Sequence, residues 1–257
     1  MYLTRFPVNT ARSEARRLLG SPHRMHGAVN MAFPRPPARD GENPRVLWRL
    51  DQAPGDRLDL LVSSPDRPDF AHLAEQAGWP SLGREGWTTF AYAEFLDALA
   101  EGDTWAFRLT ANPVHHIRRA QDPVGAPTKR TAHLTVRHQI QWLLKQQERA
   151  GFTVLRRSDP PLAQMPSPVA DAPPPEAAEE WGYQVTVHDR APVQFGRPTR
   201  DSSRPAAAPG ADVRFARATF DGRLRITGMA AFRRALTHGL GKSKAYGCGL
   251  MTLAPVR

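Results

Sequence analysis

Two histidines, His23 and His26, lie three residues apart in the segment SPHRMHGAVN. On a helix this spacing puts them on one face, and Asn30 follows a further turn along the same face. An imidazole titrates near ~6.5, so at neutral pH it can take a proton from a ribose hydroxyl or give one to a leaving oxygen. The pair therefore fits the acid and base roles of RNA cleavage. The alternative is two solvated histidines on a helix surface.

Two histidines one helical turn apart can also bind zinc. The known helical zinc signature needs an acidic residue after the second histidine and a third ligand. No acidic residue follows His26 before Asp40. A metal-dependent phosphohydrolase using His23 and His26 ranks behind a nuclease without metal or other cofactor, and inhibition by a chelator would separate the two.

The C-terminal segment GLGKSKAYGCG combines four glycines with two lysines after a predicted helix and before a predicted strand. Exposed backbone donors and two ammonium groups make a phosphate cradle. The residue order and topology differ from those of a Walker loop and of a dinucleotide fingerprint. The segment's candidate RNA-binding residues are Lys242, Ser243, Lys244 and Tyr246, and the alternative is a flexible turn with solvated lysines.

The chain carries 35 Lys and Arg against 25 Asp and Glu, a formal net charge of +10. Such a charge favours polyanions, and arginine adds planar bidentate donors for phosphate. A generic basic surface is the alternative. Aromatic residues make up only 8%, and no strand has the aromatic signature of an RRM, so we expect recognition of RNA shape and phosphates. Besides Asn30, further candidate RNA contacts are Arg24, Arg118, Arg119, Lys129, Arg130, Arg156 and Arg157.

Cys248 is the single cysteine, which excludes an internal disulfide and a cysteine-rich zinc site and agrees with a reducing compartment. No stretch approaches the ~18 apolar residues of a membrane span. The start MYLTRFPVNTARSEARR lacks the apolar core of a signal peptide. We therefore expect a cytoplasmic protein.

The hydrophobic pattern of the first half predicts strand, helix, strand, strand, helix, strand. The predicted strands are 2–8, 46–51, 57–64 and 104–113, and the predicted helices are 10–20, 22–33 and 68–77. Met25, Val29 and Phe33 recur every four residues and form the buried stripe of the second helix.

The second half predicts the same order. A predicted helix from Val136 lies between two predicted strands, KRTAHLT and FTVLRR, and WGYQVTVHD is a third strand. A predicted hairpin of VRFARATF and RLRIT turns at Asp221 and Gly222, and a helix over 229–238 follows it. Two proline-rich segments, 158–180 and 197–210, read as loops. We expect an α+β protein of two tandem ferredoxin-like units with the βαββαβ order of RAMP and RRM domains. The predicted division is 1–114, a connection at 115–127, and 128–257.

Five blocks of the chain are familiar: MYLTR, SPHRMHGAVNMAFP, LWRLD, FRLTANP and the terminal GLGKSKAYGCGLMTLAP. Together they resemble the CasE family, the CRISPR-associated endoribonucleases of type I-E Cascade. The blocks occur in the family's order over nearly the whole chain, and the terminal glycine-rich block followed by LAP is specific. The proline-rich loops match no block of the family.

The resemblance implies two ferredoxin-like domains that bind the repeat hairpin of precursor CRISPR RNA and cut once on the 3′ side of its stem. It implies a cofactor-free attack of the ribose 2′-hydroxyl on the adjacent phosphate, which gives mature crRNA with a 2′,3′-cyclic phosphate. The product stays bound, and the protein joins the other Cascade subunits. By this resemblance, His26 is the family's helix histidine, and Lys242 and Lys244 belong to its RNA-binding loop.

Position 23 departs from the family pattern, which has a tyrosine three residues before the histidine. An imidazolium at His23 would stabilise or protonate, where a tyrosine hydroxyl would only donate a hydrogen bond. Basic residues that sometimes follow the histidine are here Gly27 and Met31. These departures keep a non-catalytic RNA-binding scaffold of the same fold as an alternative.

Overall fold

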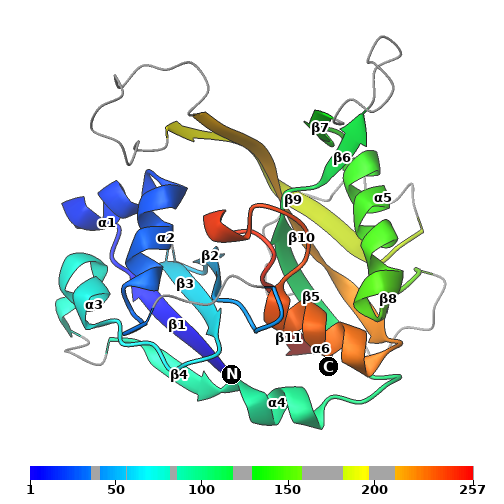
Figure 1. Ribbon diagram of the computed structural model, residues 1–257, viewed down its shortest axis with the longest axis horizontal. Helices are drawn as coiled ribbons and strands as arrows, with labels where there is room; N and C mark the ends of the chain where they lie inside the picture. The colour runs from blue at the N-terminus through cyan, green and yellow to red at the C-terminus, as the bar shows by residue number, and fades with distance from the viewer. Residues whose placement is uncertain are drawn as a thin grey trace.

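The computed structural model describes residues 1–35, 41–55, 57–81, 86–117, 129–157, 182–196 and 212–256. Two antiparallel sheets lie side by side, each accompanied by its own helices (Figure 1). Each sheet has its own hydrophobic core. No helix among the described residues is long and apolar enough to cross a membrane.

The first sheet has the strand order β2-β3-β1-β4, and every neighbouring pair is antiparallel. Its strands are β1 (Tyr2–Val8), β2 (Leu47–Ala53), β3 (Arg57–Ser64) and β4 (Thr88–Ala91), and its helices are α1 (Ser13–Leu19), α2 (Pro22–Asn30) and α3 (Ala71–Ala77). This is the split βαββαβ arrangement. The predicted β2–β3 hairpin is confirmed.

The helix α2 buries the stripe that its spacing predicts. Met25 and Val29 on the helix are 2% and 0% exposed and belong to the core of the first unit. The helix ends at Asn30 and not at residue 33 as predicted, so Phe33, 9% exposed, packs in the same core from the turn that follows. Pro22 occupies the first turn, where a missing backbone N–H is tolerated. Because this face is held against the sheet, His23, His26 and Asn30 remain on the half-buried side of the helix.

The second sheet has the order β11-β5-β10-β8, and β9 also pairs with β10. Its strands are β5 (Thr104–Ala111), β8 (Phe152–Val154), β9 (Val185–Gly196), β10 (Asp212–Ile226) and β11 (Met251–Pro255). The helices are α5 (Val136–Gln147), the 3-10 turn η2 (Glu148–Ala150), α6 (Met229–His238) and the 3-10 turn η4 (Lys244–Tyr246). The helix α4 (Tyr92–Ala98) adds Tyr92 and Leu96 to the core of this second unit. The order again matches βαββαβ, which confirms the expected tandem ferredoxin-like fold.

The prediction that the strand at 104–113 completes the first sheet is wrong. The strand β5 lies between β10 and β11 in the second sheet and starts that unit. Its buried residues Phe107 and Leu109 belong to the second core, whereas the fourth place in the first sheet goes to β4, a short and mostly exposed strand that the sequence analysis missed. Because α4 packs into the second core, we propose to place the boundary between the units directly after β4, at residues 91–92.

The segment Lys129–Ala132 was predicted as a strand of the second unit and instead forms β7, which pairs only with β6 (Val114–Ile117) in a separate two-stranded sheet. This hairpin extends beside α5 in Figure 1. The segment KRTA has no alternating apolar residues to bury, whereas β5 has them, so β5 takes the central place.

The predicted turn at Asp221 and Gly222 is also wrong, because β10 runs without a break through both residues. The carboxylate of Asp221 accepts two hydrogen bonds from Arg108 on the neighbouring strand. A Cβ at Gly222 would lie 2.5 Å from the carbonyl oxygen of Gln184. This glycine therefore serves the close approach of two strands. The long β9–β10 ribbon extends from the second unit toward α2 (Figure 1).

Arg49 on β2 joins the two units. Its side chain is 1% exposed. It donates to the carbonyl oxygens of Arg108 on β5 and Leu250 before β11, at 2.8 and 2.9 Å, and to the hydroxyl of Thr252 at 2.7 Å. Asp51 balances the charge through two hydrogen bonds of 2.6 and 2.7 Å. The edge of the first sheet is thereby fixed against the second.

Candidate active site

His26 is hydrogen-bonded to Asn30, one turn later on α2. The Asn30 Nδ2 atom lies 3.1 Å from His26 Nε2. An amide nitrogen only donates, so with this amide orientation His26 Nε2 accepts and the neutral ring carries its proton on Nδ1. Turning the amide over would present its oxygen to a protonated Nε2. Asn30 can thus support His26 in both protonation states that acid–base work requires.

Tyr246 brings the C-terminal segment against His26. The centroids of the two rings are 6.5 Å apart and the rings meet edge to face at 70°. Tyr246 also packs against two aromatic rings of the β9–β10 ribbon, Phe195 at 4.8 Å and Phe215 at 6.1 Å. His26 comes from the first unit and Tyr246 from the second, so the two units together build this site.

The glycine-rich segment is packed against tryptophans. Gly241 and Gly247 have positive φ angles of 75° and 79°. A Cβ at Gly241 would lie 2.9 Å from the Trp142 ring, and one at Gly247 would lie 2.8 Å from the Trp48 ring. Only glycine combines this backbone conformation with this close approach. This packing favours a defined loop over the alternative of a flexible turn.

Ser243 has a positive φ of 60°, which is uncommon outside glycine. Its hydroxyl accepts a hydrogen bond of 2.8 Å from the amide of the buried Asn112. This contact fixes the tip of the segment between Lys242 and Lys244. The two lysines are therefore presented by a defined backbone.

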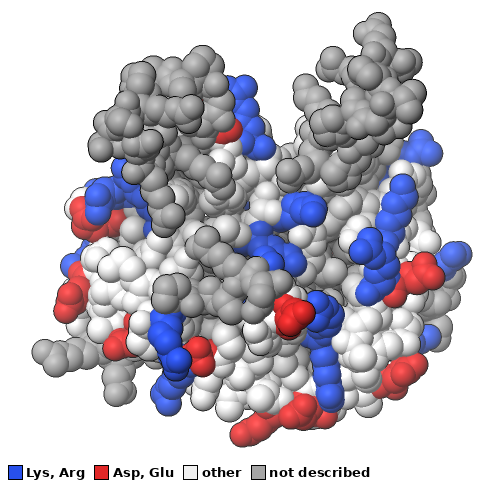
Figure 2. Space-filling model, viewed as in Figure 1, with Lys and Arg blue, Asp and Glu red and all other residues white. Residues whose placement is uncertain are grey.

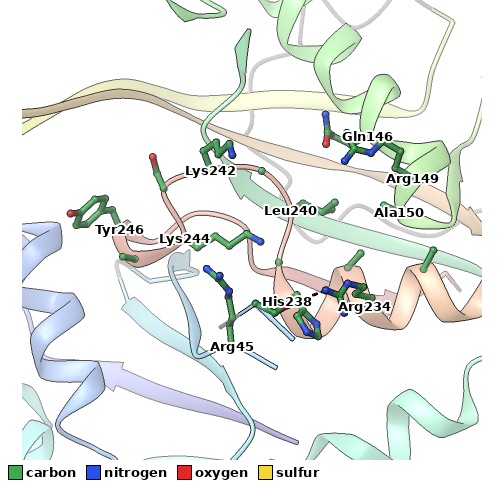
Figure 3. Close-up of a pocket in the computed structure, with 17 residues that line it drawn as sticks. Arg45, Gln146, Arg149, Ala150, Arg234, His238, Leu240, Lys242, Lys244 and Tyr246 are labelled. Carbon is green, nitrogen blue, oxygen red and sulfur yellow. Dashed lines mark hydrogen bonds between the residues drawn. The ribbon is translucent and has the colours of Figure 1, made fainter. Parts of the chain in front are cut away.

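Lys242 and Lys244 line an open cleft of about 720 Å³. Lys242 is exposed, whereas Lys244 is half-buried and extends into the cleft beside Arg45 (Figure 3). Burial, and then the nearby charges of Arg45, Lys242 and Arg234, together lower the pKa of Lys244 from 10.5 to about 8. Tyr246 lines the same cleft and connects it to His26.

His23 faces a neighbouring hollow of about 630 Å³. Arg24, at the same end of α2, lines this hollow together with Gln194 and Phe195 of β9. Phe195 in turn contacts Tyr246. His23 therefore lies on the same side of α2 as His26, next to the tip of the β9–β10 ribbon.

Of the other predicted contacts, the described residues Arg156 and Arg157 lie away from His26. Arg156 and Arg157 follow β8, which Figure 1 shows on the side of the molecule away from α2, and Arg156 lies over the ring of Tyr183 at 5.5 Å. The backbone of Lys129 and Arg130 lies in β7, and their side chains are outside the description. Arg118 and Arg119 lie outside the described residues.

Several basic residues of the cleft were missed by the sequence analysis. Arg45 precedes β2, Arg149 lies in η2, and His238 ends α6, yet all three line the same cleft. They are isolated in sequence, so no local pattern marks them. The doublet of Arg233 and Arg234 separates in the structure, because Arg233 donates to the carbonyl oxygen of Leu96 on α4 while Arg234 lines the cleft.

Within the described residues, no group of three or more His, Cys, Asp or Glu side chains is arranged to hold a metal ion. Cys248 is fully buried, and burial raises the pKa of its thiol to about 12.

The tandem ferredoxin-like units, with a histidine helix of one unit facing a basic glycine-rich loop of the other, define a protein of the RAMP class. The chain belongs to the family described as CRISPR associated protein, whose sequence model matches residues 1–255.

Proteins of known structure share this architecture along their whole length. The CRISPR-associated endoribonuclease Cse3 of Thermus thermophilus is 28% identical over 257 residues, which cover 99% of this chain and 100% of that protein. A structure of Cse3 bound to a 19 nt RNA matches with a TM-score of 0.68 and 27% identity, covering 99% of this chain and 100% of that one. A Thermus thermophilus Cse3 bound to an RNA that represents a pre-cleavage complex matches with a TM-score of 0.67 and 26% identity, covering 99% and 98%. The resemblance to the CasE family is confirmed.

Proposed function

We propose that this chain is an endoribonuclease that binds the repeat hairpin of precursor CRISPR RNA and cuts it on the 3′ side of the stem. The observation that carries the proposal is the meeting of His26, supported by Asn30, with Tyr246 and the basic loop of the second unit. The family and the names of its Cse3 relatives support the same activity. The chain then keeps the crRNA as a subunit of type I-E Cascade.

The proposed reaction needs proton transfer and charge stabilisation, which side chains can supply. The ribose 2′-oxygen forms a bond to phosphorus while the bond from phosphorus to the 5′-oxygen breaks. A proton leaves the 2′-hydroxyl and another reaches the departing 5′-oxygen. His26 transfers one of these protons, with Asn30 fixing its ring, and His23 is the candidate for the second group. The products are a 2′,3′-cyclic phosphate and a 5′-hydroxyl.

Binding rests on phosphates and on the shape of the hairpin, because the deep major groove of A-form RNA limits the reading of bases. The proposed contacts nearest the cut are Lys242, Ser243, Lys244 and Tyr246 of the loop, with Arg24 and Asn30 on α2. The more distant candidates are Arg118, Arg119, Lys129, Arg130, Arg156 and Arg157. As a nuclease of precursor RNA, the protein would work in the cytoplasm without a metal or another cofactor.

The test is the substitution His26→Ala, assayed for cleavage and for RNA affinity. We expect cleavage to fall ~10²- to 10⁴-fold, the usual contribution of one acid–base group, with affinity nearly unchanged. The control is His72→Ala. His72 lies on α3, and its Nε2 atom lies 2.8 Å from the carbonyl oxygen of Ala28 on α2, so this variant removes a histidine contact to the same helix outside the site. A loss of affinity equal to the loss of cleavage would make His26 an RNA contact and not a catalytic residue.

A further inference from the structure

The cleft beside the glycine-rich loop collects basic side chains from both units, four of them arginine or lysine besides Lys242. Arg45 of the first unit faces Lys244 across it, and Arg234 and His238 enter from α6, with Arg149 at the far wall (Figure 3). None of the described residues that line the cleft is Asp or Glu. In Figure 2, Lys and Arg side chains gather near the centre of this face, while Asp and Glu lie mostly toward its edges.

These cations are held in place by the fold. The end of α6 is tied to the segment before β2, because Arg45 N donates to the carbonyl oxygen of Thr237 at 3.0 Å. Arg234 Nη2 donates to the carbonyl oxygen of Gly41 and His238 Nε2 to that of Glu42, both at 3.0 Å. Like charges are thus kept close together, an arrangement that bound anions would stabilise.

No ion pair between described residues involves these basic side chains, namely Arg45, Arg149, Arg234, Lys242 and Lys244. The depressed pKa of Lys244, caused by burial and then by neighbouring cations, reflects the same unbalanced positive field. Such a cleft with several converging cations fits the phosphates of a nucleic-acid strand.

The size of the cleft decides which part of an RNA can enter it. A volume of about 720 Å³ is in the ~300–1,000 Å³ range of small-ligand cavities, so a short unpaired strand fits inside the cleft, whereas a double-helical stem is too wide to enter it. Tyr246 lines the cleft and also faces His26. Tyr246 thus links the cut site to the cleft, so an unpaired strand that leaves the cut site can continue into the cleft.

We propose that this cleft binds the phosphates of the unpaired RNA directly downstream of the cut. This inference rests on the proposed function, in which the nucleotide before the cut is paired in the stem and the RNA after it is single-stranded. Arg45 and Arg149 are specificity-determining contacts for that segment. Once the cut is made, the downstream strand loses its covalent link to the stem, while the hairpin product keeps its own contacts.

The experiment compares repeat hairpins whose cut is blocked by a 2′-deoxy substitution. One RNA continues for a few unpaired nucleotides after the cut, a second ends one nucleotide after it, and a third carries the extra nucleotides on its 5′ side. Affinity is measured over a range of salt for the full chain, for Arg45→Gln/Arg149→Gln, and for Arg67→Gln/Arg225→Gln. The last variant is a charge-matched control because Arg67 and Arg225 are exposed and outside the cleft.

The wild type should bind the downstream-extended RNA at least ~10-fold more tightly than the truncated one, and the cleft variant should bind both alike. Its salt slope on the extended RNA should fall by ~1.4, since each single-strand phosphate contact contributes ~0.7. Equal wild-type affinity for both RNAs overturns the proposal, as does an equal loss on both in the cleft variant. A loss confined to the 5′-extended RNA overturns the downstream assignment.

The unmodified hairpin separates this proposal from the proposed function. Affinities are measured on uncleavable RNA, so they report on the cleft whether or not the protein cuts. A chain that shows the expected affinities but never cuts the unmodified RNA would contradict the nuclease and retain the cleft as a single-strand site. Unchanged affinity of the cleft variant for the truncated RNA shows that the variant is folded.

Discussion

Removing the Arg49 side chain should reveal how strongly the two units are joined. Arg49→Met keeps much of the apolar stem and deletes five hydrogen bonds, two to Asp51 and three to β5 and the C-terminal strand region. The guanidinium is 1% exposed. Removing one partner of a buried ion pair costs about 3–5 kcal/mol, because the other charge is left uncompensated. This is a large share of the ~5–15 kcal/mol stability of an ordinary domain.

The assay is equilibrium urea unfolding, with Arg17→Met as the control. Arg17 also pairs with a carboxylate, that of Glu14, at 2.8 Å, but the two side chains are 56% and 46% exposed, and exposed pairs contribute only ~0.2–1 kcal/mol. The double variant Arg49→Met/Asp51→Asn should recover part of the lost stability, because it removes the orphaned charge. If Arg49→Met destabilises no more than Arg17→Met, the reasoning about this buried contact is refuted.

Two further substitutions test the second sheet. Burial raises the pKa of Asp221, but hydrogen bonds from Arg108 and His188 outweigh it and bring the value from 3.8 to about 2, while the bond to Asp221 raises the pKa of His188. The lowered pKa of Asp221 therefore adds to the free energy of unfolding above pH ~4, and this contribution is lost as pH falls toward 2. The raised pKa of His188 adds to it below pH ~6.5, and that contribution is lost as pH rises through the raised pKa. Asp221→Asn should flatten the pH dependence of the urea midpoint in both windows, and curves parallel to the wild type would contradict this. Gly222→Ala should destabilise the protein by ~1–3 kcal/mol, because the added Cβ meets the backbone of Gln184. Gly27→Ala should instead stabilise α2 by ~0.5–1 kcal/mol, because a Cβ at Gly27 has no atom within 4 Å. Equal melting temperatures of the two variants would contradict this contrast.

Local pattern predicted the elements more reliably than their partners. The buried spacing of Met25 and Val29 identifies α2 because burial on a helix has a fixed period, although Phe33 of the same spacing lies past the end of the helix. The local sequence of a strand does not show which other strands it pairs with, so the alternating residues of β5 were assigned to the wrong sheet. The pair Asp221 and Gly222 has turn composition, but its side-chain contacts across the sheet favour a continuous strand.

The site was predictable where its residues are close in the chain. His26 and Asn30 share a helix face by spacing alone, and the lysines around Ser243 stand in one recognisable block. The contact between His26 and Tyr246 spans almost the whole chain and depends on how the two units dock. Arg45 and Arg149 meet Lys244 only in the folded protein, so no reading of the sequence would have grouped them.

Cleavage of an end-labelled repeat hairpin in the presence of a chelator tests the central claim most directly, beside the same RNA with a single 2′-deoxy at the cut. The proposed reaction predicts that the unmodified RNA is cut to a product with a 2′,3′-cyclic phosphate and that the deoxy RNA binds equally well but stays intact. Cutting of the deoxy RNA, or cutting only after metal is restored, would contradict attack by the 2′-hydroxyl without metal. If neither RNA is cut although both bind tightly, the chain is an RNA-binding scaffold and not a nuclease.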